Sequence, residues 1–92
     1  MVPLEVMKLA KRAIELSAIA VAKGFAPSLS DAAVAGHAAF ACLSGAYLNV
    51  RINLRESKDE KFVSETRRLA DNVREDGERA LSKATSEVAS RL

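Results

Sequence analysis

The chain has 92 residues, which allows one domain, and its 14 basic and 12 acidic side chains leave a net charge of only +2. These charges are interspersed, so the sequence lacks the basic stripe that binding to nucleic acid requires. Cys42 is the only cysteine, which excludes an internal disulfide and a cysteine-based metal site, and no zinc-ligand spacing occurs, so we expect no metal. Charged residues interrupt the early apolar run, so we expect no signal peptide and a cytoplasmic protein.

The first predicted helix runs from Pro3 to Gly24. Proline is favoured in the first turn of a helix, where its missing N–H is not needed, and glycine is a frequent helix stop. Charged residues recur at spacings of three and four along one side, which marks that side as the solvent face. The opposite side carries the residues that we expect in the core: Leu4, Met7, Ile14 and Val21.

The second predicted helix begins at Ser28 or Ser30 and ends near Arg55. Either serine hydroxyl can accept a hydrogen bond from a free backbone N–H, and Asp31 suits the positive end of the helix dipole. Between Ser28 and Leu54, Ala, Gly and Ser make up 12 of 27 residues, and there is no Lys. A helix this small-sided and apolar is predicted to be enclosed by other helices.

This apolar segment is long enough to cross a membrane. Its polar side chains, His37 and Asn49 among them, and its short alanines instead favour a buried helix of a soluble protein, so we expect no membrane partner. Cys42 is then a small buried hydrophobe and not a nucleophile. The smallest residues are interpreted as packing positions, with close approach to a ligand as the alternative. They are Ala32, Gly36, Ala41 and Gly45.

The third predicted helix begins near Ser57 and continues to the C-terminus. Ser57 and Glu60 have the spacing of a capping box, and Gly77 indicates a kink or a tight helix crossing. The helix is densely charged apart from one narrow apolar stripe, made of Phe62, Thr66, Leu69, Val73, Ala80, Ala84 and Val88.

The lengths of these helices predict a homo-oligomer. A helix of roughly 33 residues spans about 50 Å, whereas a compact domain of this size is about 30 Å across, so the third helix should overhang a three-helix globule. The second helix also needs cover on more sides than two neighbours provide. We therefore predict an all-α fold, one helical domain over residues 1–92, whose three long helices form a bundle completed by a second copy, most simply as a homodimer.

At 100° per residue, the polar side chains of the second helix fall into two stripes. The first contains His37, Ser44, Arg51 and Arg55, flanked by Phe40 and Tyr47. The second contains Asp31, Asn49, Asn53 and Glu56. Asp31 and Asn49 lie about 27 Å apart along the helix axis, so a pocket that uses both needs a second, antiparallel chain.

Each stripe has a functional and a structural interpretation. In a ligand cleft, Arg51 or Arg55 binds a carboxylate, an aromatic ring stacks on a flat heterocycle, and His37 transfers protons. As structure alone, His37 is a hydrogen-bonded interior residue and the arginines lie at the solvent edge. Likewise, Asn49 and Asn53 either orient a substrate amide or bridge two helices by hydrogen bonds.

The segment SDAAVAGHAAFACLSGAYLNVRINL resembles the cyclodeaminase and methenyl-tetrahydrofolate cyclohydrolase family, which includes the cyclodeaminase half of formiminotransferase-cyclodeaminase. The matching features are Ser30-Asp31 ahead of a small-residue run, and LNVRINL over residues 48–54. The flanking segments VPLEVMKLAKRAIELSAIAVAKG and DEKFVSETRRLADNVRED also fit the helical pattern of the family. The resemblance covers most of the chain and corresponds to the C-terminal half of the family's fold.

The resemblance implies an all-α dimer that holds a tetrahydrofolate derivative in a cleft between helices. It also implies elimination of ammonia from formimino-tetrahydrofolate or hydrolysis of the methenyl form. Carried over by position, it makes Asp31 a catalytic candidate, and the first polar stripe adds His37. The resemblance also makes Asn49, Arg51 and Asn53 substrate-binding candidates, and the first polar stripe adds Tyr47.

Two functions remain open. Family members carry a Gly-rich, Ser-containing segment ahead of this region that contributes to the pocket, and this sequence does not contain it. In the first hypothesis, the chain is a folate-dependent cyclodeaminase or cyclohydrolase of one-carbon metabolism, active as an oligomer or with a separately encoded N-terminal half. In the alternative, it is a non-catalytic helical oligomer or subunit with a structural or interaction role.

Overall fold

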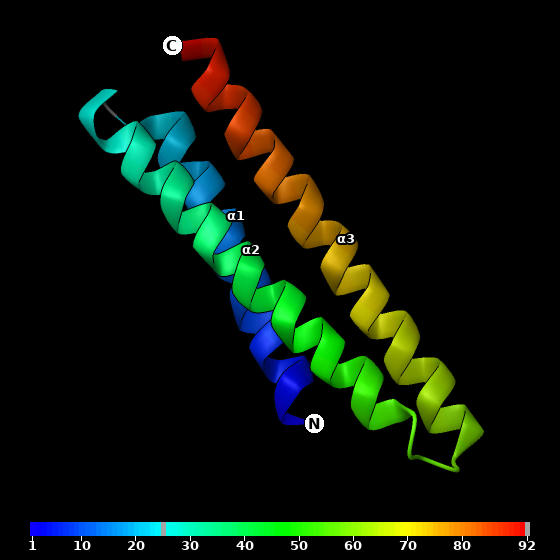
Figure 1. Cartoon of the computed structure of the whole chain (residues 1–92). Coiled ribbons are helices and arrows are strands. Elements are labelled where there is room, and N and C mark those ends of the chain that lie inside the picture. The colour runs from blue at the N-terminus through cyan, green and yellow to red at the C-terminus, as the bar shows by residue number, and fades with distance from the viewer. Residues whose placement is uncertain (25, 92) are drawn as a thin grey trace.

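Three helices make up the protein in the computed structural model, which describes residues 1–24 and 26–91, with side chains for residues 1–24 and 29–91. They are α1 (Val2–Lys23), α2 (Ala26–Leu54) and α3 (Glu60–Arg91). Consecutive helices run in opposite directions, so α1 and α3 are parallel and α2 is antiparallel to both (Figure 1). The described residues contain no strand, which confirms the predicted all-α class and its three long helices.

The bundle is a rod of 51 × 15 × 14 Å with a radius of gyration of 15.0 Å. A compact globule of this length would have a radius of gyration of about 12 Å. Because the domain is elongated, α3 fits alongside its neighbours, and Arg91 Nη1 in its last turn donates to the carbonyls of Val21 at 2.9 Å and Gly24 at 3.1 Å. The predicted overhang of the third helix is therefore wrong, and it gives no support to a homodimer.

The start of α3 is capped by a different residue from the one predicted. Asp59 is the cap, since the backbone N–H of Phe62 donates to Asp59 Oδ1 at 3.0 Å. Ser57 lies in the preceding turn, where its Oγ accepts from the backbone N–H of Asp59 at 3.3 Å. The cap therefore lies two residues after the predicted one, and the capping box does not form, because Phe62 occupies the position that a box needs for Glu or Gln.

The start of α2 is also earlier than predicted. The helix begins at Ala26, so Ser30 and Asp31 lie within its first turns and do not cap it. The side chain of Ser28, the other predicted cap, lies outside the described residues.

The core is a line of aliphatic side chains along the axis of the rod. The predicted inner face of α1 is buried throughout, and it packs against Leu43, Val50 and Leu54 of α2 and against small residues of α3. At Gly77 the helices approach closely, because a Cβ there would lie 2.7 Å from Leu43 Cδ1 and 3.5 Å from Ile14 Cδ1. The predicted tight crossing is confirmed.

The predicted stripe of α3 is correct in its centre and too wide at one edge. Thr66, Val73 and Ala84 are buried and Ala80 and Val88 are partly covered. The side chains of Phe62 and Leu69 are exposed, since they stand at the rim of the stripe. The buried positions that the prediction left out are Ala70 and Gly77.

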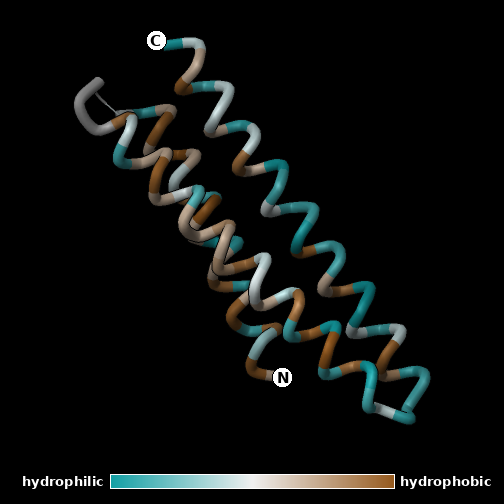
Figure 2. Tube along the Cα trace, in the orientation of Figure 1, coloured by the Kyte–Doolittle hydropathy of each residue, from teal (hydrophilic) through white to brown (hydrophobic). Residues whose placement is uncertain are grey.

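α2 is much less covered than its composition predicts. α1 and α3 pack on one side of it, and the other side is exposed; Figure 2 shows this apolar helix beside the strongly hydrophilic α3. By length and composition the segment Leu29–Leu54 could cross a membrane, and 28% of its most apolar window is buried in the bundle. The helices of this chain therefore do not enclose α2.

Cys42 and Gly45 lie on this uncovered side. Cys42 is exposed, so the prediction of a buried hydrophobe is wrong for the single chain. A Cβ on Gly45 would meet no described atom within 4 Å, whereas one on Gly36 would lie 2.7 Å from Ser17 Oγ. Of the predicted packing positions, Ala32 and Gly36 serve that purpose within the chain, and Gly45 and the exposed Ala41 do not.

Candidate functional site

Tyr47 joins α2 to α3 through hydrogen bonds at its hydroxyl. The residue is buried, its hydroxyl donates to Asp71 Oδ1 at 2.6 Å, and it accepts from Arg51 Nη1 at 2.9 Å. Arg51 follows Tyr47 by one helical turn, so both side chains leave α2 on the same face. The structure thus brings together two of the predicted substrate-binding residues.

Arg74 and Asp71 complete this cluster from α3. The Arg74 guanidinium carbon lies 4.5 Å from the centroid of the Tyr47 ring, within the range of a cation–π contact. Its Nε is buried and has no hydrogen-bond partner among the described residues. With Arg74 over the ring, Tyr47 is placed to hold Arg51 and Asp71 and not to stack on a ligand.

Neither Asp71 nor Arg74 was singled out from the sequence. Both lie in a helix where charged residues occur in every turn, so an acidic and a basic residue three positions apart carry no special signal. Only the register of α3 against Tyr47 distinguishes this pair from the others, and that register is a property of the packed core.

Asn49 and Asn53 lie on another side of α2, as the separation of the two polar stripes predicts. Both are exposed, and neither side chain forms a hydrogen bond within the described part of the chain. Asn49 lines a groove of about 380 Å³ between α1 and α2 whose other walls are mainly apolar, with Val6 and Cys42 among them. Asn53 does not reach this groove. The interpretation in which both asparagines bridge helices gains no support from the single chain.

Asp31 and His37 are exposed and point to different sides of α2. They are six positions apart in the helix, which rotates their directions by about 120°. The structural interpretation of His37 as an interior residue is therefore wrong for the single chain. One chain does not gather the six predicted site residues, because Asp31 and His37 remain apart from each other and from the Tyr47–Arg51 pair.

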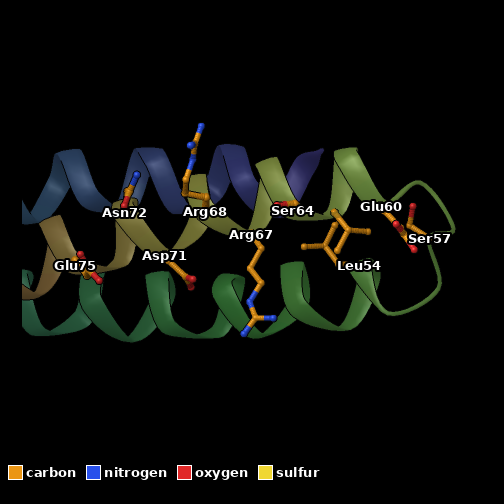
Figure 3. Close-up of a pocket in the computed structure, with 10 residues that line it drawn as sticks. Leu54, Ser57, Glu60, Ser64, Arg67, Arg68, Asp71, Asn72 and Glu75 are labelled. Atoms are coloured by element: carbon orange, nitrogen blue, oxygen red, sulfur yellow. The ribbon is translucent and has the colours of Figure 1, made fainter.

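A groove of about 630 Å³ lies along α3 beside the turn that follows α2 (Figure 3). Its walls carry both signs of charge. They are formed by Leu54, Ser57, Glu60, Val63, Ser64, Arg67, Arg68, Asp71, Asn72 and Glu75. Asp71 connects this groove to the Tyr47 hydroxyl, so the cluster between α2 and α3 has an opening to solvent.

The chemistry available here is that of binding and orientation. Arg51 keeps four of its five N–H donors after its bond to Tyr47, and that bond fixes the direction of the guanidinium. A positioned guanidinium is suited to a carboxylate or a phosphate, which it can bind through two parallel hydrogen bonds.

The family model described as formiminotransferase-cyclodeaminase matches residues 1–72 of this chain. The matched region contains α1, α2 and the part of α3 that carries Asp71. Comparisons with curated proteins and with solved structures find no match.

Proposed function

Since the chain belongs to the formiminotransferase-cyclodeaminase family, we propose that it acts in folate-dependent one-carbon metabolism and binds a tetrahydrofolate derivative. The observation that carries this proposal is the family match over residues 1–72, which includes all six residues selected from the sequence. Arg51, which Tyr47 holds in place, supports it, because a folate carries carboxylates at the end of its glutamate tail. We also propose that the protein works in the cytosol, where folate metabolism of this kind takes place.

The proposed reaction is the release of ammonia from formimino-tetrahydrofolate. N10 of the folate attacks the carbon of the protonated formimino group, the bond from that carbon to its terminal nitrogen breaks, and the N10 proton ends on that nitrogen. Ammonia departs, and the methenyl cation that bridges N5 and N10 is the product. Asp31 is proposed as the base that accepts the N10 proton and His37 as the acid that donates to the leaving nitrogen. Asn49 and Asn53 would hydrogen-bond the amide edge of the pterin. Hydrolysis of the methenyl form is the alternative reaction for the same residues.

A second copy of the chain is proposed to complete this site. Asp31 and Asn49 share a side of α2 at opposite ends, and an antiparallel partner would bring its Asn49 towards Asp31. A separately encoded N-terminal half of the family's fold is the alternative partner.

The uncovered apolar side chains of α1 and α2 support the second copy. On α1, Val2, Leu9 and Leu16 recur every seventh residue, and Val2 and Leu9 are 76% and 73% exposed. On α2, Val34 and Leu48 are 66% and 59% exposed. A spacing of seven residues is typical of helices that pack along their length against another helix.

The size of this face also fits a dimer. The 22 residues of α1 extend over about 33 Å at the standard rise. Two packed helices about 9 Å apart present a face roughly 20 Å wide, hence about 650 Å², close to the roughly 800 Å² that each partner buries in a stable complex.

Thermal unfolding with a tetrahydrofolate derivative tests the binding proposal. A ligand present at 100 times its Kd stabilises the native state by about 2.7 kcal/mol, which raises the Tm of a domain this size by about 10 °C or more. We expect Arg51→Ala to abolish this rise and to leave the oligomer size unchanged. Arg12→Ala, an exposed arginine on the outer side of α1, is the matched control and should keep the rise. If the wild-type protein shows no rise at millimolar ligand, the folate proposal fails.

The mass of the protein in solution tests the proposed partner. We expect light scattering to give a mass of at least two chains, and Leu48→Glu to reduce it to one, because a carboxylate would be buried in the interface. Leu69→Glu is the control, since Leu69 is an exposed leucine on α3, outside the α1–α2 face. A wild-type protein of one chain that binds detergent micelles would favour a membrane over a second copy.

A non-catalytic oligomer is the second candidate function. The separation of Asp31 from His37 within the chain favours it, because this proposed base and this proposed acid do not meet there. It predicts folate binding without turnover. Incubation with formimino-tetrahydrofolate, followed by measurement of ammonia, distinguishes the two: release above the uncatalysed rate supports the enzyme, and its absence in a protein that binds folate supports the non-catalytic role.

A further inference from the structure

Three arginines surround a small pocket at the end of the bundle where α2 turns into α3. The pocket has a volume of about 130 Å³ and is lined by Arg51, Leu54, Arg55, Val63 and Arg67. Leu54 is buried and Val63 is half-buried, so the wall of the pocket is partly apolar. None of its lining residues is acidic. Arg51 is half-buried, and Arg55 and Arg67 are exposed.

None of these arginines forms a salt bridge within the described residues. Arg51 is linked to the Asp71 carboxylate through the Tyr47 hydroxyl. Arg51 donates one N–H to the Tyr47 hydroxyl. The guanidinium groups of Arg55 and Arg67 form no hydrogen bond with the described part of the chain. The positive charges around one pocket repel one another, and each guanidinium retains donors in the planar arrangement that matches an oxyanion.

The carboxylates of this region do not line the small pocket. Asp71 accepts from Tyr47, and Glu60 and Glu75 line the larger groove along α3, a groove that Arg67 also borders. Glu56 follows Arg55 in the chain and lines a separate hollow with it. Asp71 is therefore committed to α2 through Tyr47, and none of the other three lines the arginine pocket.

The negative end of the α2 dipole accounts for only part of this positive charge. A helix C-terminus is equivalent to about half a negative charge, and its effect fades within the last turn. Arg51 lies in that last turn and Arg55 directly after the helix, so they benefit from it. Arg67 belongs to the second turn of α3, and about half a charge is small against three guanidiniums.

Of the two consecutive arginines Arg67 and Arg68 on α3, only Arg67 is directed towards the pocket. In Figure 3, the Arg67 side chain extends across towards α2, whereas Arg68 points to the opposite side of α3. Arg67 lines the small pocket and Arg68 does not. Two consecutive arginines of one helix thus differ in whether they face the cluster.

We propose that the pocket between Arg51, Arg55 and Arg67 binds an oxyanion that carries two or more negative charges, such as a phosphate group or a dicarboxylate. An oxyanion there accepts bidentate hydrogen bonds from the guanidiniums and removes their mutual repulsion. Arg51 is shared with the proposed folate function, where it binds a carboxylate. The two proposals are tested apart, because inorganic phosphate and glutarate probe this pocket without folate and without a second chain.

Amide and arginine Nε–H NMR spectra of the ¹⁵N-labelled protein test this site at constant ionic strength, with sodium chloride exchanged for inorganic phosphate in one series and for glutarate in another. We expect saturable shifts of the Arg51, Arg55 and Arg67 Nε–H signals. The anion that binds more tightly identifies whether the pocket prefers a phosphate group or a dicarboxylate. Arg67→Gln should weaken the affinity about tenfold or more, the cost of losing a hydrogen bond to a charged group. Arg68→Gln, the matched control, should change it less than about twofold.

Two results would overturn the proposal. One is the absence of saturable shifts at these three signals with both anions in a protein whose spectrum is that of the folded state. The other is an equal loss of affinity in Arg67→Gln and Arg68→Gln, which would show a diffuse positive surface without a site. If Arg67→Gln fails to fold, Arg67→Lys keeps the charge without the bidentate geometry, and it should still bind the anion more weakly than wild type.

Discussion

Removal of the Tyr47 hydroxyl tests the polar cluster between α2 and α3. Tyr47→Phe keeps the buried ring and its contact with Arg74, and it removes one bond to the Asp71 carboxylate and one from the Arg51 guanidinium. Hydrogen bonds to charged groups contribute about 1.5–3 kcal/mol each. Because Asp71 and Arg51 are both partly exposed, water replaces part of this, and we expect a loss of about 2 kcal/mol for the two together.

Urea unfolding followed by circular dichroism, at one fixed protein concentration, measures this loss. A loss of about 2 kcal/mol corresponds to a fall in Tm of about 8–16 °C for a domain of this size. Asp71→Asn retains an acceptor oxygen and should cost about 1 kcal/mol. The double variant should cost less than the sum of the two, with a coupling of about 1 kcal/mol. A loss below about 0.5 kcal/mol for Tyr47→Phe, or strict additivity in the double variant, would show that the cluster does not hold α3 against α2.

Two further predictions concern the core and the uncovered face of α2. Leu43→Ala should cost about 2–5 kcal/mol in urea unfolding, because Leu43 is fully buried. Gly77→Ala gains about 1 kcal/mol of helix propensity but forces a Cβ against Leu43. We therefore expect it to lower the free energy of unfolding in the wild-type background and to raise it in the Leu43→Ala background. An increase in both backgrounds would refute the tight crossing. Cys42 should react with a thiol reagent more slowly in the wild-type protein than in Leu48→Glu, and equal rates would mean that no partner covers it.

The helices and the inner face of α1 were predictable because they depend on local rules. Leu4, Met7, Ile14 and Val21 recur at the period of a helix that packs on one side, and that period does not depend on the partner. Gly77 was recognisable as a crossing point for a similar reason, since an interior glycine without a packing role costs about 1 kcal/mol.

The cover of α2 was not predictable, because composition reports only that a surface needs to be buried. The same run of small and apolar residues fits enclosure within the chain, a second copy or a membrane. Cys42 was placed in the interior for this reason, and it lies on the side that α1 and α3 leave open.

The contacts of the site depend on a register that no single segment encodes. Tyr47 and Arg51 are one turn apart, so their proximity follows from the helix alone. The partner Asp71 depends on how far α3 slides along α2, and the turn and the core around Leu43 and Gly77 fix that position. The arginine pocket depends on the same register, since Arg67 comes from α3 and Arg51 and Arg55 come from α2 and its turn.

Isothermal titration of the wild-type protein with methenyl-tetrahydrofolate tests the central proposal most directly. Membership of the family predicts saturable binding, and a site shared by two chains predicts that Leu48→Glu abolishes it together with the oligomer. Saturable binding that disappears in that variant is the expected result. The absence of measurable heat at millimolar ligand, with a protein that is folded and oligomeric, would contradict a folate-binding role.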